Sequence, residues 1–453
     1  MLSLVLGRVT DRSVTVSAIT RKPIKGFFEY GTKPGRYTRQ TSATDFPAGE
    51  PVETVFEGLE PNTEYFYSFR ATEPNIDFPP APSECRFHTQ RATGCEFTFA
   101  IQGDSHPERP QMSDPALYAR TLQHVAAARP DLYICMGDDF SIERLRTFTA
   151  ESVADRYRLQ RPFLGIVARS APIYLLNGNH EQASLFNYNQ SGVAHHAAIF
   201  AQNARNLYFP TPAPDDFYTG NDEPLAGIGL LKNYVSWSWG DALFVILDNY
   251  WHSASCVDTS LEATGGGKSN DGHKNRDWWA ITLGDVQYRW FKRTLETSNA
   301  KYKFVFAHHV LGTGRGGIDE SDLYEWGGRD KRGNSPFHQK RPGWEMPVHQ
   351  LMVKHGVTVF FQGHDHLFAR QERDGIIYQE VPMPADPGYA AYNADKYASG
   401  VKLPNSGFLQ VSVSPERVKV DYVRTYLPKD ETDQRKTGEI AYSYSLPPRT
   451  AHS

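Results

Sequence analysis

The segment PIYLLNGNHE (residues 172–181) joins a short apolar run to a cluster of amide, imidazole and carboxylate side chains. A run of this length is typical of a buried strand. Asn and Gly are common in turns, so the segment taken alone indicates a strand that ends in a surface turn. The alternative is that the strand carries Asn179 and His180 into a site at the edge of a sheet.

Four more apolar runs of the chain end in residues of the same chemical kind. They are CEFTFAIQ before GDSH (103–106), DLYICM before GDDF (137–140), KFVFA before HH (308–309) and VTVFFQ before GHDH (363–366). In open αβ sheets, ligands bind outside the carboxyl ends of the strands. Five unrelated surface turns do not explain a set that consists of potential metal ligands, so we predict one common metal site.

The ligand types favour particular metals. Imidazole, carboxylate and amide together suit Mn, Fe, Zn or Co, whereas Mg and Ca prefer sites made mostly of oxygen. None of the four cysteines belongs to the set, which argues against a structural zinc centre. Two adjacent divalent ions lower the pKa of a water and stabilise the attacking and leaving oxygens of a displacement. Two ions and two aspartates leave a net positive charge that suits a phosphate ester.

Composition excludes several other classes of protein. The chain has 453 residues, enough for two domains, and a net charge of −4 at pH 7, which favours neither nucleic acid nor an anionic membrane surface. It contains no apolar run of the roughly 18 residues that a transmembrane helix needs. The opening MLSLVLGRVTDR is too short for a secretory signal, so we expect either an intracellular protein or an exported form whose signal has been trimmed.

Residues 1–90 predict a small all-β domain. The runs SVTVSAI (13–19), GFFEYG (26–31) and EYFYSFRA (64–71) have strand character and are separated by turn residues. Between them, LEPNTEY (59–65) resembles the corner of fibronectin type III domains, in which a tyrosine hydroxyl bonds to the backbone a few residues upstream. We therefore expect a fibronectin type III-like β-sandwich.

Residues 91–425 predict an α/β domain. Apolar strand-like runs alternate with helical candidates at 115–129 and 285–298, and a hairpin at 408–425 closes the domain. This order predicts helices on both faces of mixed sheets. Residues 426–453 are expected to form a C-terminal extension.

The ordered motifs GDSH, GDDF, GNHE, HH and GHDH resemble those of the calcineurin-like metallophosphoesterases across 91–425. The resemblance implies a four-layer αββα sandwich and the hydrolysis of phosphoric esters by a hydroxide that bridges two divalent ions. Carried over by position, the metal ligands are Asp104, His106 and His366 for one ion, Asn179, His308 and His364 for the other, and Asp138 as the bridge. His180 would contact the phosphate and help to protonate the leaving oxygen. His308 is preferred to His309 as the ligand on the basis of the family motif.

A fibronectin-like domain before the catalytic domain is similar to the layout of purple acid phosphatases and alkaline phosphatase D-like enzymes. Purple acid phosphatases have GDxG as their first motif and a ferric-iron tyrosine three residues after the bridging aspartate. This chain has His106 and Ser141 at those positions. A stable ferric–tyrosine pair is therefore not expected, and the broader superfamily pattern fits better.

The substrate is expected to be a small phosphate ester. Arg315, in the glycine-rich loop LGTGRGG, is a candidate phosphate clamp because arginine can grip phosphate with two parallel hydrogen bonds; the alternative is a solvated loop residue. The resemblance to two-domain phosphatases favours phosphomonoesters, with nucleotide or phospholipid diesters as the alternative. A remote alternative is a non-catalytic binding protein. That alternative predicts that at least one metal-ligand residue is missing from the sequence, and all seven are present.

Overall fold

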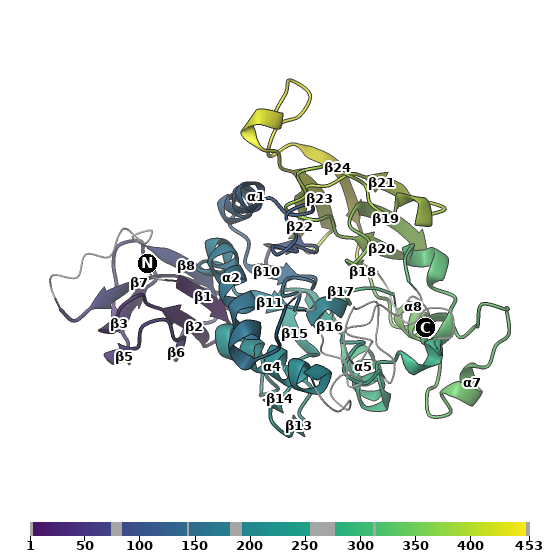
Figure 1. Ribbon diagram of the computed structural model, residues 1–453, viewed down its shortest axis with the longest axis horizontal. Helices are drawn as coiled ribbons and strands as arrows, with labels where there is room; N and C mark the ends of the chain where they lie inside the picture. The colour runs from purple at the N-terminus through teal and green to yellow at the C-terminus, as the bar shows by residue number, and fades with distance from the viewer. Residues whose placement is uncertain are drawn as a thin grey trace.

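The computed structural model describes residues 3–73, 84–142, 145–181, 193–253, 277–310 and 314–449, with the backbone alone for residues 193–196. Figure 1 shows a small β-rich unit, drawn in purple, beside a larger unit that contains the labelled helices and the remaining sheets. Mixed α/β architecture follows a β-rich N-terminal region, as the sequence predicts.

The N-terminal unit is a sandwich of two antiparallel sheets. One has the strand order β1-β2-β6, and the other has the order β4-β3-β7-β8 with β5 paired to β3. The strands are β1 Ser3–Gly7, β2 Val14–Ile19, β3 Ile24–Gly31, β4 Arg39–Gln40, β5 Thr44–Phe46, β6 Val52–Phe56, β7 Glu64–Ala71 and β8 Cys85–His88. At the predicted corner, the backbone N–H of Glu60 donates a 2.9 Å hydrogen bond to the hydroxyl of Tyr65. The contact agrees with the fibronectin type III-like fold expected for this region.

The larger unit is built on two sheets packed face to face. The first has six strands in the order β11-β10-β9-β22-β23-β24. Its strands are β9 Phe97–Gln102, β10 Leu132–Cys135, β11 Ile173–Leu175, β22 Gly407–Val413, β23 Val418–Arg424 and β24 Ile440–Leu446. β9, β10 and β11 run parallel, so the carboxyl ends of the three strands meet at one edge.

The second sheet has eight strands in the order β12-β15-β16-β17-β18-β20-β19-β21. They are β12 Thr219–Gly220, β15 Val235–Trp239, β16 Ala242–Ile246, β17 Tyr302–Phe306, β18 Val359–Gln362, β19 Phe368–Arg373, β20 Ile376–Glu380 and β21 Val401–Leu403. Strands β16, β17, β18 and β20 are parallel. A separate ribbon pairs β13 Pro224–Leu225 with β14 Gly229–Leu230.

Helices cover the outer face of each sheet and complete the four αββα layers. Against the six-stranded sheet lie α1 Pro115–Ala127, α2 Ala150–Ala168 and α4 Val193–Tyr208. Against the eight-stranded sheet lie α5 Asp285–Thr297, α6 Tyr324–Gly327, α7 Phe337–Lys340 and α8 Val348–Lys354. Phenylalanines fill the space between the sheets, and the rings of Phe99 and Phe244 lie 5.0 Å apart.

Local sequence explains where α1 begins. Asp114 accepts hydrogen bonds from the backbone N–H groups of Ala116 and Leu117, and Pro115 occupies the first helical position, where no N–H is needed. The cap fixes the end of the loop that follows β9, and this loop carries the GDSH motif.

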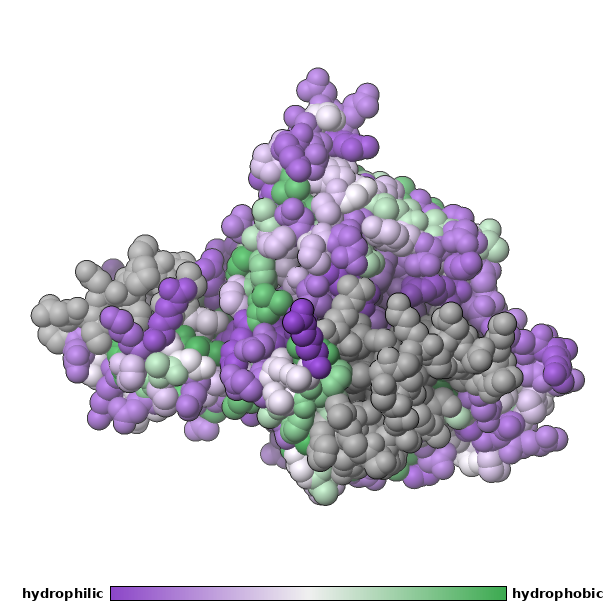
Figure 2. All heavy atoms as spheres, in the orientation of Figure 1, coloured by the Kyte–Doolittle hydropathy of each residue, from purple (hydrophilic) through white to green (hydrophobic). Residues whose placement is uncertain are grey.

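The segment 426–453 supplies β24, which pairs antiparallel with β23 at the edge of the six-stranded sheet. The connection between β23 and β24 projects from the top of the molecule in Figure 1, and Figure 2 shows that this projection is hydrophilic. Of the helices in the described residues, none combines the length and apolar composition needed to span a bilayer.

Candidate metal centre

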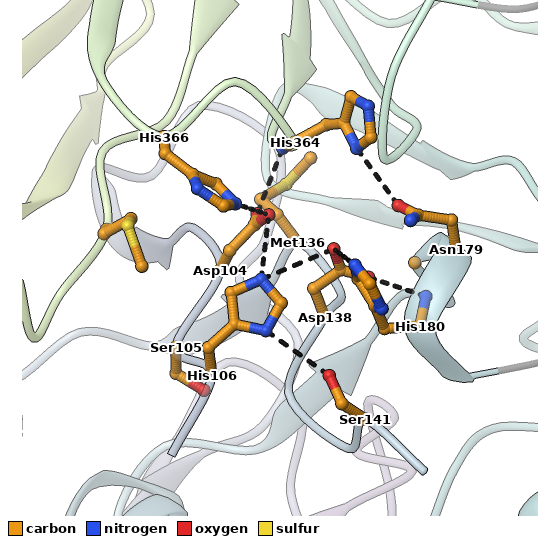
Figure 3. A network of polar contacts seen from close by, with 12 residues as sticks. Asp104, Ser105, His106, Met136, Asp138, Ser141, Asn179, His180, His364 and His366 are labelled. Carbon is orange, nitrogen blue, oxygen red and sulfur yellow. Dashed lines mark hydrogen bonds and ion pairs between the residues drawn. The ribbon is translucent and has the colours of Figure 1, made fainter. Parts of the chain in front are cut away.

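The parallel strands of both sheets deliver the predicted ligands to one place. Asp104 and His106 follow β9, Asp138 follows β10, and Asn179 follows β11. His308 follows β17, while His364 and His366 follow β18. Figure 3 shows the side chains that it labels from this set converging from both sheets.

Four of the converging residues have an unusual backbone conformation. His106, Asp138, His364 and His366 all have positive φ, at 39°, 58°, 77° and 60°. For residues other than glycine this region costs on the order of 1–3 kcal/mol each, and such conformations cluster at functional sites. The surrounding structure must therefore hold the four side chains in place.

Two motif glycines are required because other parts of the centre approach them. A Cβ atom on Gly178 would lie 2.1 Å from Oδ1 of Asp138, and one on Gly363 would lie 2.7 Å from Oδ1 of Asp104. Any side chain at either position would collide with a predicted ligand. This explains why glycine stands directly before the coordinating residues.

The first group of potential ligands comprises Asp104, His106, Asp138 and His366, whose ligand atoms all lie within 4.8 Å of one another. Nε2 of His366 lies 2.9 Å from Oδ2 of Asp104. Nε2 of His106 lies 3.9 Å from Oδ2 of Asp104 and 3.7 Å from Oδ2 of Asp138. All four residues are buried.

The second group comprises Asp138, His308 and His364, again within 4.8 Å of one another. Nε2 of His308 lies 3.2 Å from Oδ2 of Asp138. The amide oxygen of Asn179 joins this group, at 3.1 Å from Nε2 of His308 and 3.0 Å from Nδ1 of His364. Asp138 is common to both groups.

The first group fits a metal ion. Nε2 of His106 is buried and has no hydrogen-bond partner among the described residues, although it points toward two carboxylates. The distances from Nε2 to those oxygens are too long for hydrogen bonds. They suit three atoms that coordinate the same cation. A cation held between these donor atoms would satisfy the buried ring nitrogen.

The electrostatics of the centre also demand positive charge. Burial disfavours ionisation of Asp138, but nearby histidines, His308 foremost, hold its pKa well below the usual value. Burial likewise opposes protonation of His308, yet Asp138 and Asp104 raise its pKa to about 10. Two buried carboxylates thus attract a cation, which in the absence of metal is a proton on His308.

His308 and His309 point in different directions, as expected for neighbours after a strand. Nδ1 of His308 lies 2.8 Å from the carbonyl oxygen of Met136, which turns Nε2 toward Asp138. Nδ1 of His309 instead lies 2.8 Å from the Tyr250 hydroxyl. Only His308 of the two belongs to the described groups of potential ligands.

His180 lies beside the shared aspartate. Its backbone N–H donates a 2.9 Å hydrogen bond to Oδ1 of Asp138, and its Nε2 lies 3.7 Å from Oδ2 of the same residue (Figure 3). The His180 side chain is 15% exposed, whereas that of Asp138 is 1% exposed. His180 is therefore the more accessible of the two side chains.

Arg315 lies on the His364 side of the centre. Its Nη1 contacts the carbonyl oxygen of His364 and lies 3.1 Å from Oδ1 of Asp365. The other oxygen of Asp365 accepts a 2.9 Å hydrogen bond from the backbone N–H of Gly316. Arg315 is 30% exposed and is held in place by Asp365. Asp365 thus positions the arginine.

Sequence reasoning missed Glu108 and Arg109, in the loop after GDSH. Oε1 of Glu108 lies 3.4 Å from Nδ1 of His106 and 3.2 Å from Nε of Arg109. Nη2 of Arg109 lies 3.1 Å from Nδ1 and 3.2 Å from Nε2 of His180. The residues PER after His106 resemble an ordinary turn, so no sequence signal marked them.

Ser141, which stands at the tyrosine position of purple acid phosphatases, also contacts the centre. Its hydroxyl lies 3.3 Å from Nδ1 of His106 (Figure 3). The serine thus supports a histidine of the first group, through the ring nitrogen opposite Nε2.

Comparisons with known proteins agree with this fold. The chain resembles the solved structure of PhoD, with a TM-score of 0.66 and 15% identity over 98% of this chain and 90% of that one. It also resembles the purple acid phosphatase PPD1 from yellow lupin (Lupinus luteus), with a TM-score of 0.60 and 15% identity over 98% of this chain and 74% of that one. At this identity the likeness concerns the fold. No curated protein matches the chain in a sequence search.

The family model for calcineurin-like phosphoesterases matches residues 97–368, a range that contains all five strand-end motifs. The chain therefore belongs to the calcineurin-like phosphoesterase family.

Proposed function

We propose that the chain hydrolyses phosphoric esters with the help of two divalent metal ions, and that it prefers monoesters. The observation that carries the proposal is that Asp138 belongs to both groups of potential ligands. A shared carboxylate can bridge two adjacent ions of the kind that catalyse phosphoryl displacement. Family membership and the phosphatase neighbours support the same reaction class.

In this proposal seven residues hold the ions. One ion is held by Asp104, His106 and His366, the other by Asn179, His308 and His364, and both by Asp138. The donor set of nitrogen and oxygen atoms suits Mn, Fe, Zn or Co. Ions bound there would activate water and neutralise charge on the phosphoryl oxygens during an in-line displacement.

The chain itself supplies the proton for the leaving group. His180 lies beside Asp138 and is the more exposed of the two, and its position is fixed by its own backbone hydrogen bond to that residue. A side chain within reach of the leaving oxygen can act as a general acid. We assign this role to His180.

Charge favours monoesters, which carry one more negative charge than diesters. Arg315 lies beside His364 and is partly exposed, so it can contribute to holding a phosphoryl oxygen. The purple acid phosphatase likeness supports the same preference, although nucleotide or phospholipid diesters remain the alternative substrates.

The test is to strip the purified protein with chelator, reload it with Mn(II) and measure kcat/KM for p-nitrophenyl phosphate and bis-p-nitrophenyl phosphate. We expect activity to return with the metal and to be higher on the monoester. A higher value on the diester would overturn the preference. An absence of activity on both esters with Mn, Fe, Zn and Co in turn would overturn the proposed reaction.

A further inference from the structure

We infer that Arg109 binds a non-bridging oxygen of a terminal, dianionic phosphoryl group and holds His180 in position beside it. The inference rests on the proposed function, since it names a further substrate contact of the same centre.

The guanidinium of Arg109 lies over the face of the His180 ring. Its Nη2 is almost equally distant from both ring nitrogens, at 3.1 and 3.2 Å. In the plane of the ring this position would collide with Cε1, which lies between the two nitrogens. Nη2 must therefore approach from above the ring, as in a cation–π contact.

A face contact keeps the edge of the His180 ring directed at the centre. The edge carries Nε2, which lies 3.7 Å from Oδ2 of Asp138. Arg109 can thus fix the orientation of the ring while the edge of the ring stays available for proton transfer to the leaving oxygen. Contact of this kind suits a residue that positions a proton donor.

Arg109 forms an ion pair with Glu108 on its other side. Its Nε lies 3.2 Å from Oε1 of Glu108, and that oxygen lies 3.4 Å from Nδ1 of His106. The guanidinium thus contacts both Glu108, which lies beside the predicted ligand His106, and His180, the predicted proton donor. Its side chain is 12% exposed and that of Glu108 is 2% exposed, so the arginine is the member of the pair that reaches toward solvent.

The placement of the two arginines suits a terminal phosphate. Arg109 stands at the His106 and His180 side of the centre, and Arg315 stands at the His364 side. Arginine binds phosphate oxygens through a rigid fork of donors. A second cation near the phosphoryl position benefits a dianionic monoester more than a monoanionic diester, because the attraction scales with the charge.

A purely structural role for Arg109 is the competing explanation. In that case the arginine only braces Glu108, and through it His106. Removing it would then weaken metal binding and reduce the hydrolysis of all esters alike. A substrate contact predicts unequal losses with the metals retained.

The experiment compares Arg109→Met and Arg109→Lys with the control Arg120→Met, all loaded with Mn(II). Arg120 lies on α1 and pairs with Glu431 at 2.7 Å, apart from the centre. Metal content, kcat/KM for p-nitrophenyl phosphate and bis-p-nitrophenyl phosphate, and calorimetric binding of inorganic phosphate are measured for each protein. Guanidinium ion is then added to Arg109→Met.

We expect Arg109→Met to keep the metal content of the wild type and to lose roughly 10²-fold in kcat/KM on the monoester, since one preorganised donor is lost. The kcat/KM on the diester should fall less than about fivefold, because the diester carries less charge for the arginine to attract. Inorganic phosphate should bind about tenfold more weakly. Arg109→Lys should retain part of the monoester activity, and guanidinium ion should restore part of it to Arg109→Met. Arg120→Met should match the wild type.

Equal losses on both esters together with lost metal would show that Arg109 is a structural brace, and wild-type values would show that it has no role. Both outcomes would overturn the inference while leaving the proposed function intact. If the wild-type protein hydrolysed neither ester, the proposed function would fail, and phosphate calorimetry would still decide whether Arg109 binds the anion.

Discussion

The carboxylate of Glu181 accepts a 3.1 Å hydrogen bond from the backbone N–H of Asp138, the residue shared by the two groups of potential ligands. The same Oε2 atom accepts from the N–H of Gly178, and Oε1 accepts from Asp139 and Phe140 at 2.8 and 3.1 Å. Glu181 is buried. Four N–H groups of two loops therefore depend on one carboxylate.

Replacement of Glu181 by Gln should separate these loops. The amide group has only one acceptor oxygen, so its NH₂ would face two backbone N–H donors. Leaving two buried donors unsatisfied should lower the free energy of unfolding by about 2–5 kcal/mol, and metal affinity should fall with it. Urea denaturation and metal titration measure both effects. The exposed Glu50 provides the control Glu50→Gln, and equal stability of the two variants would contradict the role given to Glu181.

Replacement of Asp138 and replacement of His180 should have different effects on metal content and activity. Asp138→Asn weakens the shared ligand, so metal content and activity should fall together. His180→Ala removes a proton donor but no proposed ligand, so the metals should stay while kcat falls, by roughly 10²-fold or more on an ester with a poor leaving group. The loss should shrink for p-nitrophenyl phosphate, whose leaving group needs little protonation.

Metal analysis and kcat for phenyl phosphate and p-nitrophenyl phosphate test this pair of variants. Full activity of His180→Ala on the poor leaving group would exclude His180 as the proton donor. Retention of metal by Asp138→Asn at the level of the wild type would exclude Asp138 as the shared ligand.

The sequence predicts the parts of the centre that follow directly from the strands. Each apolar run marks a strand, and the glycine after four of them marks a point where chains come too close for a side chain, as Gly178 and Gly363 show. Parallel strands then carry the following residues to one edge of their sheet. The alternation of strand-like and helical runs predicts helices on both faces of mixed sheets. The four-layer αββα arrangement comes from the family resemblance.

The remaining features depend on contacts between distant segments. Glu181 and Arg109 act on residues 43 and 71 positions away, and no local pattern records those pairings. Helix α2 is not among the helical candidates named from the sequence, and Pro162 lies inside it, a residue that sequence patterns usually treat as a break. Capping of this helix by Thr149 and its burial against the sheet outweigh the proline.

Metal binding should release a proton from His308. The carboxylates of Asp138 and Asp104 raise the pKa of His308 to about 10 in the metal-free protein, against 6.5 for an ordinary histidine. The stability that this proton gives to the metal-free fold is complete below pH 6.5 and disappears as the pH rises through 10. At pH 8 a metal ion must displace the proton, so affinity should increase with pH.

Calorimetry of Mn(II) binding at pH 8, in buffers of different ionisation enthalpy, counts the protons released. We expect at least one for the wild-type protein, and a count of zero would contradict the assignment. As a control, the imidazole ¹⁵N spectrum of the metal-free protein at pH 8 should contain an imidazolium signal that the His308→Asn variant lacks.

Arg161 should couple the N-terminal sandwich to the catalytic domain. Its side chain is 1% exposed and donates to the carbonyl oxygen and hydroxyl of Ser17, at 2.7 and 3.1 Å, to the hydroxyl of Ser3 at 3.2 Å, and to the carbonyl oxygen of Tyr208. Arg161→Met keeps much of the volume but leaves these acceptors unsatisfied, so the free energy of unfolding should fall by about 2–4 kcal/mol. Arg158→Met, on the same helix, should cost less than Arg161→Met because the ion pair of Arg158 with Glu151 is exposed and exposed ion pairs contribute little. Scanning calorimetry should also resolve two transitions in Arg161→Met where the wild type shows one. Equal stabilities of the two variants, with a single transition in each, would mean that Arg161 does not hold the domains together.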